Sequence, residues 1–113
     1  MLPQTSRLKK KKDIERVFKK GKGVKEDFLI LKTVKNDLNE TRFGFIVSQK
    51  ISKKANIRNK IKRRLRELVK VKLKKLKKGT DNLIIVLPGL ETKDFWEIEE
   101  IITKLIKKAQ VLK

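Results

Sequence analysis

The side chains best suited to chemistry in this chain form a short series in its middle: Arg58, Asn59, Lys62, Arg63 and Arg66. An arginine offers a planar fork of donors that matches phosphate oxygens, and a lysine offers a mobile point charge. An asparagine near a helix N-terminus can donate to a phosphate or to a ribose 2′-hydroxyl. Because the spacing repeats at each helical turn, these side chains would form one rigid ridge, which suits a folded RNA.

The residue types most used for catalysis and for metal binding are missing. The sequence has no His and no Cys, which removes the commonest general base and the commonest metal ligands. Four acids crowd one late segment: Asp94, Glu97, Glu99 and Glu100. No second segment supplies ligands to pair with them. We therefore predict no catalytic and no metal-binding side chain, and a protein nuclease is disfavoured.

The charge of the chain is large and unevenly placed. The 33 Lys and Arg exceed the 13 Asp and Glu by 20 among 113 residues. Residues 1–25 carry a net +8 and residues 53–78 a net +13, whereas residues 26–52 and 79–113 are close to neutral. Such self-repulsion opposes folding, so two basic blocks predict a polyanionic partner. The alternative is a lysine-rich solvated surface of the kind found in thermophiles.

The elements that must position the ridge follow from hydrophobic spacing. Residues 11–20 predict a short helix with an apolar face made by Ile14, Val17 and Phe18. Residues 28–34 and 42–48 are rich in β-formers, and turn residues separate them, so we expect a hairpin.

Residues 57–77 form the longest helical pattern, and its inward face is predicted to comprise Ile57, Ile61, Leu65, Leu68 and Leu76. Residues 83–87 are continuously apolar, as in a strand covered on both faces. Residues 92–109 predict a last amphipathic helix with Phe95, Ile98, Ile102, Leu105 and Ile106 facing inward.

These elements predict an α+β protein, a single-domain two-layer sandwich spanning residues 1–113. The order is αβββαβα or αββαβα, depending on whether residues 28–48 make three strands or two. Residues 1–10 are expected to form a flexible basic arm. No apolar run is long enough to span a membrane, and the first residues lack the apolar region of a signal peptide, so we expect a cytoplasmic protein.

Two groups of motifs carry a resemblance to a known family. The string Arg58-Asn-x-x-Lys-Arg-x-x-Arg66-Glu67, preceded by Gly44-x-x-Val47-Ser48-x-Lys50, resembles the signature of the bacterial ribonuclease P protein component. The early and late segments are also similar to that family: Arg7-Leu8, then Ile14-x-x-Val17-Phe18-x-x-Gly21, and Ile84-Ile85-Val86 followed by Pro88-Gly89.

The resemblance implies an accessory protein of a ribonucleoprotein endonuclease that removes the 5′ leader of precursor tRNA. The RNA subunit would carry the chemistry with magnesium that it binds itself, and the protein would hold no metal firmly. The implied partners are ribonuclease P RNA and precursor tRNA, without an obligate protein partner or a membrane. The implied fold contains a rare left-handed βαβ crossover, which the usual handedness rule would not predict.

The resemblance also implies two binding sites. The RNA subunit would meet the ridge residues Arg58, Asn59, Lys62, Arg63 and Arg66, together with Lys50, Lys53 and Lys54. The leader would lie in a cleft between the first helix and one sheet face, against Phe18, Ile14, Val17 and Leu31. The chain departs from the family in having aliphatic residues at Ile14 and Leu31, where aromatic residues are common, and Gln49 in place of a lysine.

Two other functions fit parts of the sequence. A ribosomal or other structural RNA-binding protein would explain the charge and the ridge, but not the joint spacing of all the motifs. A DNA-binding module could use residues 57–77 as a major-groove helix, but the short turn and paired helix of a helix-turn-helix are missing.

Overall fold

The computed structural model of this chain describes residues 7–38, 40–72 and 78–111. The elements follow in the order α1 (Lys11–Lys20), β1 (Lys22–Glu26), β2 (Leu29–Lys35), β3 (Arg42–Ile46), α2 (Ala55–Lys72), β4 (Thr80–Val86), the short 3-10 helix η3 (Leu90–Thr92) and α3 (Phe95–Val111). The α+β class and the αβββαβα order are confirmed. The predicted helical residues 73–77, Leu76 among them, lie outside the described residues, as do residues 1–6 of the predicted arm.

The sheet has the strand order β1-β2-β4-β3. β4 pairs antiparallel with β2 and parallel with β3, so the predicted hairpin between β2 and β3 is wrong. In the centre of the sheet β4 has a pairing strand at each edge, and its residues are almost entirely buried, as expected for a continuous apolar run.

The third strand also differs from the prediction. β1 lies at residues 22–26, before the segment in which a third strand was expected, and it pairs antiparallel with β2 at the sheet edge. Its residues are mostly exposed, so it lacks the apolar alternation by which strands are recognised in sequence.

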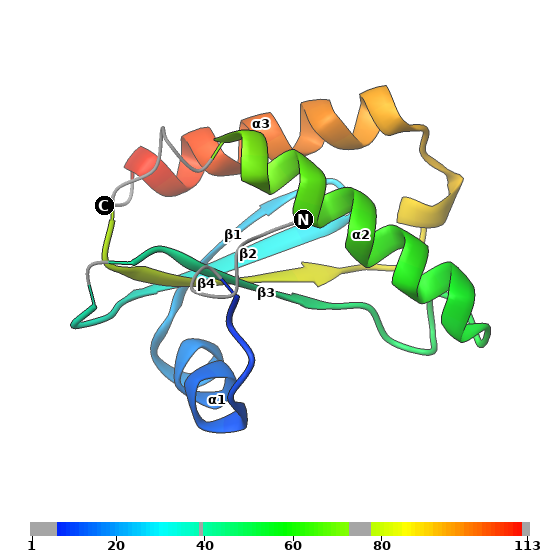
Figure 1. Ribbon diagram of the computed structural model, residues 1–113. Helices are drawn as coiled ribbons and strands as arrows, with labels where there is room; N and C mark the ends of the chain where they lie inside the picture. Colours follow the sequence, from blue (N-terminus) through cyan, green and yellow to red (C-terminus); the bar gives the residue numbers. More distant parts are fainter. Residues whose placement is uncertain (1–6, 39, 73–77, 112–113) are drawn as a thin grey trace.

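α2 and α3 cover one face of the sheet, and α1 lies beneath the other (Figure 1). The chain leaves β3, crosses above the sheet in α2 and returns in β4 parallel to β3, which makes a βαβ crossover (Figure 1). Its left hand stays a prediction from the resemblance. The two-layer description applies to the sheet with α2 and α3, and α1 adds partial cover to the second face.

The larger part of the core lies between the sheet and the helix pair α2 and α3. Leu65 of α2 and Ile102 and Leu105 of α3 are fully buried there against Leu31 and Ile84 of the sheet. In α3, the inward positions Ile98, Ile102, Leu105 and Ile106 are confirmed. The prediction that Phe95 faces inward is wrong: it is 36% exposed at the first residue of the helix, where its ring meets the exposed Trp96 ring edge-on.

The smaller part of the core lies under α1. Val17 and Leu83 are fully buried there, and Leu8 covers Gly44, where a side-chain Cβ would lie 3.1 Å from the Leu8 carbonyl oxygen. The Leu8 amide donates to the Phe43 carbonyl oxygen over 2.8 Å, and Arg7 forms a parallel bridge with Phe43. Arg7 and Leu8, near the end of the predicted basic arm, are therefore paired with β3 at the sheet edge, and the flexibility of the arm stays a prediction. No helix in the described ranges is long and apolar enough to cross a membrane.

Candidate nucleic-acid interface

The predicted ridge exists on α2. Ile61, Leu65, Leu68 and Val69 are buried against the rest of the molecule, so the positions between them face outward. The ridge residues accordingly run from exposed, in the case of Asn59 and Arg63, to half-buried, in the case of Arg58, Lys62 and Arg66. One amphipathic helix therefore brings all five predicted side chains into one series.

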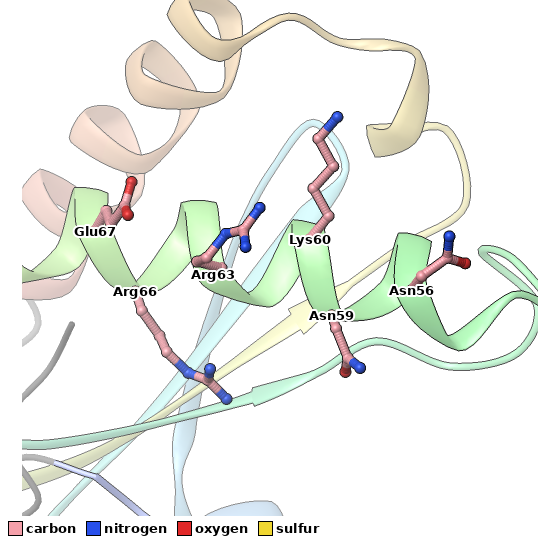
Figure 2. A pocket seen from close by; sticks show the side chains of 6 residues that line it. All are labelled: Asn56, Asn59, Lys60, Arg63, Arg66 and Glu67. Atoms are coloured by element: carbon pink, nitrogen blue, oxygen red, sulfur yellow. The ribbon is translucent and has the colours of Figure 1, made fainter.

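A shallow hollow of about 440 Å³ follows this helix and is lined by Asn56, Asn59, Lys60, Arg63, Arg66 and Glu67. Figure 2 shows the Asn59 and Arg66 side chains extending to one side of α2, with Lys60 and Glu67 extending to the opposite side. Asn56 and Lys60 were not predicted. Their signal was present in the sequence, because they precede Asn59 and Arg63 by three residues and so lie beside them on a helix.

Arg58 has a different role from the other four. Its Nη1 donates to the Ser52 carbonyl oxygen over 2.8 Å, so the guanidinium fastens the loop that leads into α2. Ile51 in this loop is buried, and the Ser48 and Ser52 hydroxyls accept from the amides of Lys50 and Lys54.

The loop presents three cations beside the first turn of α2. The predicted residues Lys50, Lys53 and Lys54 are all exposed on it, as is Gln49. They extend the basic surface of α2 toward the end of β3. Because Arg58 and Ile51 fix the loop, the loop lysines have a defined place relative to the ridge.

A second surface lies on the face of the sheet that carries α1. Phe18 is 43% exposed, and the Lys32 ammonium stands 4.9 Å from the centroid of its ring. The same ammonium donates to the Phe18 carbonyl oxygen over 3.2 Å. Ile14 is half-buried beside the small core. The structure therefore brings Phe18 and Ile14 together on an accessible helix.

Two predicted leader residues are not available on this surface. Val17 has no exposed area and belongs to the small core, so it supports α1 from beneath. Leu31, also predicted to line the leader cleft, is 2% exposed and faces α2 and α3, so the structure does not bring it together with Phe18. Successive strand residues point to opposite faces, and the neighbouring Lys32 is the one that faces Phe18.

A row of isoleucines on this face was missed. Ile30 is paired with Ile85, and Ile85 with Ile46, so the three side chains stand side by side across β2, β4 and β3. All three are half-buried, and the exposed Lys25 of β1 continues the row beyond Ile30. Because alternate residues of β2 point to opposite faces, the sequence could have placed Ile30 on this face. The row itself depends on the strand order, which local sequence patterns do not contain.

The described residues contain no group of three or more His, Cys, Asp or Glu side chains that could hold a metal ion. The interface is thus made of cations, amides, one exposed aromatic ring and half-buried aliphatic side chains. These groups can bind phosphates, sugar hydroxyls and base faces.

A family model described as ribonuclease P matches residues 2–110. The chain belongs to the ribonuclease P protein family. This confirms the family resemblance that the two motif groups carried, over nearly the whole chain.

Individual members of the ribonuclease P protein family agree with this assignment. The ribonuclease P protein component of a Synechocystis strain is 40% identical over 77% of this chain and 71% of its own length. The structure of a Staphylococcus aureus ribonuclease P protein mutant superposes with a TM-score of 0.88 at 30% identity, covering 95% of this chain and 90% of that one. The Thermotoga maritima ribonuclease P protein superposes with a TM-score of 0.82 at 31% identity, covering 90% of this chain and 96% of that one. Sequence and fold together support the role of a protein component of ribonuclease P in tRNA processing, with an RNA partner.

Proposed function

We propose that this chain binds the ribonuclease P RNA through α2 and binds the 5′ leader of precursor tRNA through the surface around Phe18. The observation that carries the proposal is the presence of two surfaces with different chemistry. The α2 surface is cationic and rigid, whereas the Phe18 surface combines an exposed ring with aliphatic side chains and cations at its borders. The first suits a folded phosphate backbone, and the second suits unpaired bases.

The ion pairing of the ridge cations supports the first half of the proposal, that α2 binds the RNA subunit. Among the described residues, Lys62, Arg63 and Arg66 form no ion pair with an acid. Glu67, which also lines the hollow, is the one acid within α2. The cations are therefore free to replace the counterions of RNA phosphates, which is the main source of salt-dependent affinity.

The exposure of Phe18 supports the second half. The Phe18 ring is 43% exposed on a helix backed by fully buried Val17, and Lys32 covers one of its faces, so a base would stack on the other face. Stacking of one base on an aromatic ring contributes about 1–3 kcal/mol. Lys32 lies over the Phe18 ring and Lys25 at the end of the isoleucine row, so both place a positive charge on the surface that would hold the leader.

In this proposal the protein is an accessory subunit, located in the cytoplasm and without an obligate protein partner. The bond cleavage would be carried by the RNA subunit with magnesium that the RNA holds. The protein side chains would contribute binding: the α2 surface would orient the protein on the RNA subunit, and the Phe18 surface would favour precursor tRNA over the mature product.

The test is cleavage of precursor tRNA by a bacterial ribonuclease P RNA at low magnesium, with and without this protein. We expect cleavage at the mature 5′ end at low magnesium only when the protein is present. RNA binding without any stimulation of cleavage would contradict the proposal and would favour a structural RNA-binding protein. Preferential binding of duplex DNA over structured RNA at equal salt would favour the DNA-binding alternative.

A further inference from the structure

Four charged side chains form a network at the end of the sheet where α1 is attached. At its centre is Asp81 of β4, whose side chain has no exposed area. Arg42 of β3 donates to both carboxylate oxygens of Asp81, from Nε over 2.8 Å and from Nη2 over 2.7 Å. Asn36 donates to the same carboxylate over 2.7 Å. Such a two-pronged arginine–carboxylate pair is strongly directional.

The network continues into α1 through two residues. Arg42 Nη1 lies 3.4 Å from the Asp13 carboxylate. Arg16 Nη2 lies 3.4 Å from the Asp81 carboxylate and donates to the Lys35 carbonyl oxygen over 3.0 Å. Asp13 and Arg16 of α1 are thereby joined to β2, β3 and β4. The two acids and two arginines balance, so the network is neutral within a strongly basic protein.

The position of these residues on α1 is informative. At about 100° per residue, Asp13 and Arg16 lie about 140° and 160° around the helix from Phe18. Val17, which is fully buried, lies between the two flanks. One flank of α1 is therefore held by ion pairs, and the opposite flank carries the exposed ring. A rotation of α1 about its own axis would break the ion pairs and move Phe18 away from Lys32.

We propose that this network positions the leader-binding surface by fixing the rotation of α1 on the sheet. Asp13, Arg16, Arg42 and Asp81 are positioning residues in this view, and they act on the leader through Phe18 without touching it. The inference rests on the proposed function, because it assigns a role to the network in leader binding.

Apolar packing alone would not fix the helix in this way. The small core under α1 has Leu8, Val17 and Leu83 as its buried residues, and such packing is non-directional. Burying charges is costly, and replacing a buried ion network by apolar side chains often stabilises a protein. Ion pairs are directional, so this network is well suited to defining one orientation of a short helix.

The test uses two variants on α1, each with a matched control on the same helix. Asp13→Asn removes a negative charge from the network, and Glu15→Gln removes one from an exposed position. Arg16→Gln removes a positive charge from the network, and Lys12→Gln removes one from an exposed position. The two network variants change the net charge in opposite directions, so a general electrostatic effect on RNA binding would have opposite signs. Asp13→Glu serves as the conservative variant.

Three quantities are measured for the full chain: amide hydrogen exchange in α1, preference for precursor over mature tRNA in the holoenzyme, and affinity for ribonuclease P RNA. For both network variants, we expect α1 exchange to rise by about fivefold, because the helix opens more readily without its ion pairs. The precursor preference should fall by about threefold or more, with RNA affinity retained. The controls should match the original protein, and Asp13→Glu should recover part of the preference.

Unchanged precursor preference despite faster α1 exchange would overturn the inference, as would opposite effects of the two network variants. A loss of RNA affinity in parallel with precursor preference would also overturn it, because it would indicate general loss of structure. If the original protein shows no precursor preference, the proposed function fails, and the leader role with it. The exchange measurement would then still decide whether the network holds α1.

Discussion

At the scale of single residues, most of the ridge side chains on α2 face outward, whereas one of them, Arg58, also binds the loop that precedes the helix. Arg63 and Arg66 line the open hollow, whereas Arg58 donates to the Ser52 carbonyl oxygen. The sequence motif treats these arginines alike, because they repeat with the same helical spacing. The structure separates a role in direct phosphate binding from a role in fixing the lysine-bearing loop.

Arg63→Ala or Arg66→Ala should weaken assembly with ribonuclease P RNA. The slope of log K against log salt should fall by about one unit for each phosphate that the variant no longer binds. Binding titrations over a range of salt concentrations measure this slope. Lys107→Ala, at an exposed position on α3, is the matched control and should leave the slope unchanged. An unchanged slope in both arginine variants would remove these residues from the interface.

Phe18→Ala should lower the preference for precursor over mature tRNA by about tenfold, as expected from the loss of one stacked base. Affinity for ribonuclease P RNA should be retained, because Phe18 lies on α1 and the ridge lies on α2 on the opposite face of the sheet (Figure 1). Phe18→Tyr keeps the ring and should keep the preference. Circular dichroism of each variant checks that the fold is intact, and a loss of preference in the tyrosine variant as well would contradict stacking.

At the scale of elements, the strand order determines which side chains share a surface. The isoleucine row forms because β4 stands between β2 and β3, which are joined to it in opposite senses. The same order buries Leu31 against the helix pair and turns Lys32 toward Phe18. An error of one residue in a strand therefore moves a predicted site residue to the other face of the sheet.

The turn between β4 and α3 depends on Gly89. Its φ is +112°, and a Cβ there would lie 2.5 Å from the Phe28 ring, so Gly89→Ala combines backbone strain with a clash. We expect a loss of about 2–3 kcal/mol in the free energy of unfolding. Gly23→Ala in β1 is the control, because its Cβ would meet its nearest neighbour at 3.7 Å. Urea unfolding measures the free energy of unfolding of both variants. Equal values for Gly89→Ala and Gly23→Ala would contradict the strain assigned to Gly89.

At the scale of the whole molecule, a chain with a net charge of +20 buries the Asp81 carboxylate completely and pairs it with Arg42 and Arg16. Burial alone would raise the pKa of Asp81. The hydrogen bonds from Arg42 and Asn36 and the charges of Arg42 and Arg16 outweigh burial, and the pKa is lowered from its ordinary value of 3.8. The pKa of Arg42 is raised in turn, chiefly by its hydrogen bonds to Asp81.

This linkage predicts how stability depends on pH. A carboxylate whose pKa is lower in the folded state contributes its full stabilisation above the unfolded value. That contribution is lost as the pH falls below about 3.8 toward the folded pKa. Asp81→Asn should cost about 3 kcal/mol at neutral pH, as expected when one partner of a buried pair is removed.

Melting temperatures measured from pH 7 down to pH 3 test this expectation. The difference in melting temperature between the original protein and Asp81→Asn should be constant above pH 5 and should become smaller toward pH 3. Asp37→Asn, at an exposed position in the turn after β2, is the control and should follow the original protein throughout. A difference that widens on acidification would contradict the lowered pKa.

Features encoded by local spacing were predictable from the sequence. The ridge on α2, the short helix ending before Gly21, the doubly covered strand β4 and the inward face of α3 all follow from periods of one turn or one pleat. The family motifs, which are also local strings, determined the family.

Contacts between residues that are distant in the chain were not predictable, because they depend on how the whole chain packs. Asp81 joins Arg42 and Arg16, which precede it by 39 and 65 residues, and no local period relates them. The hairpin prediction failed because it paired β2 with β3, whereas β4, whose continuous apolar run suits the buried centre of a sheet, lies between them. Local spacing shows which side of an element is apolar, but the partner that covers it is selected by packing of the whole chain.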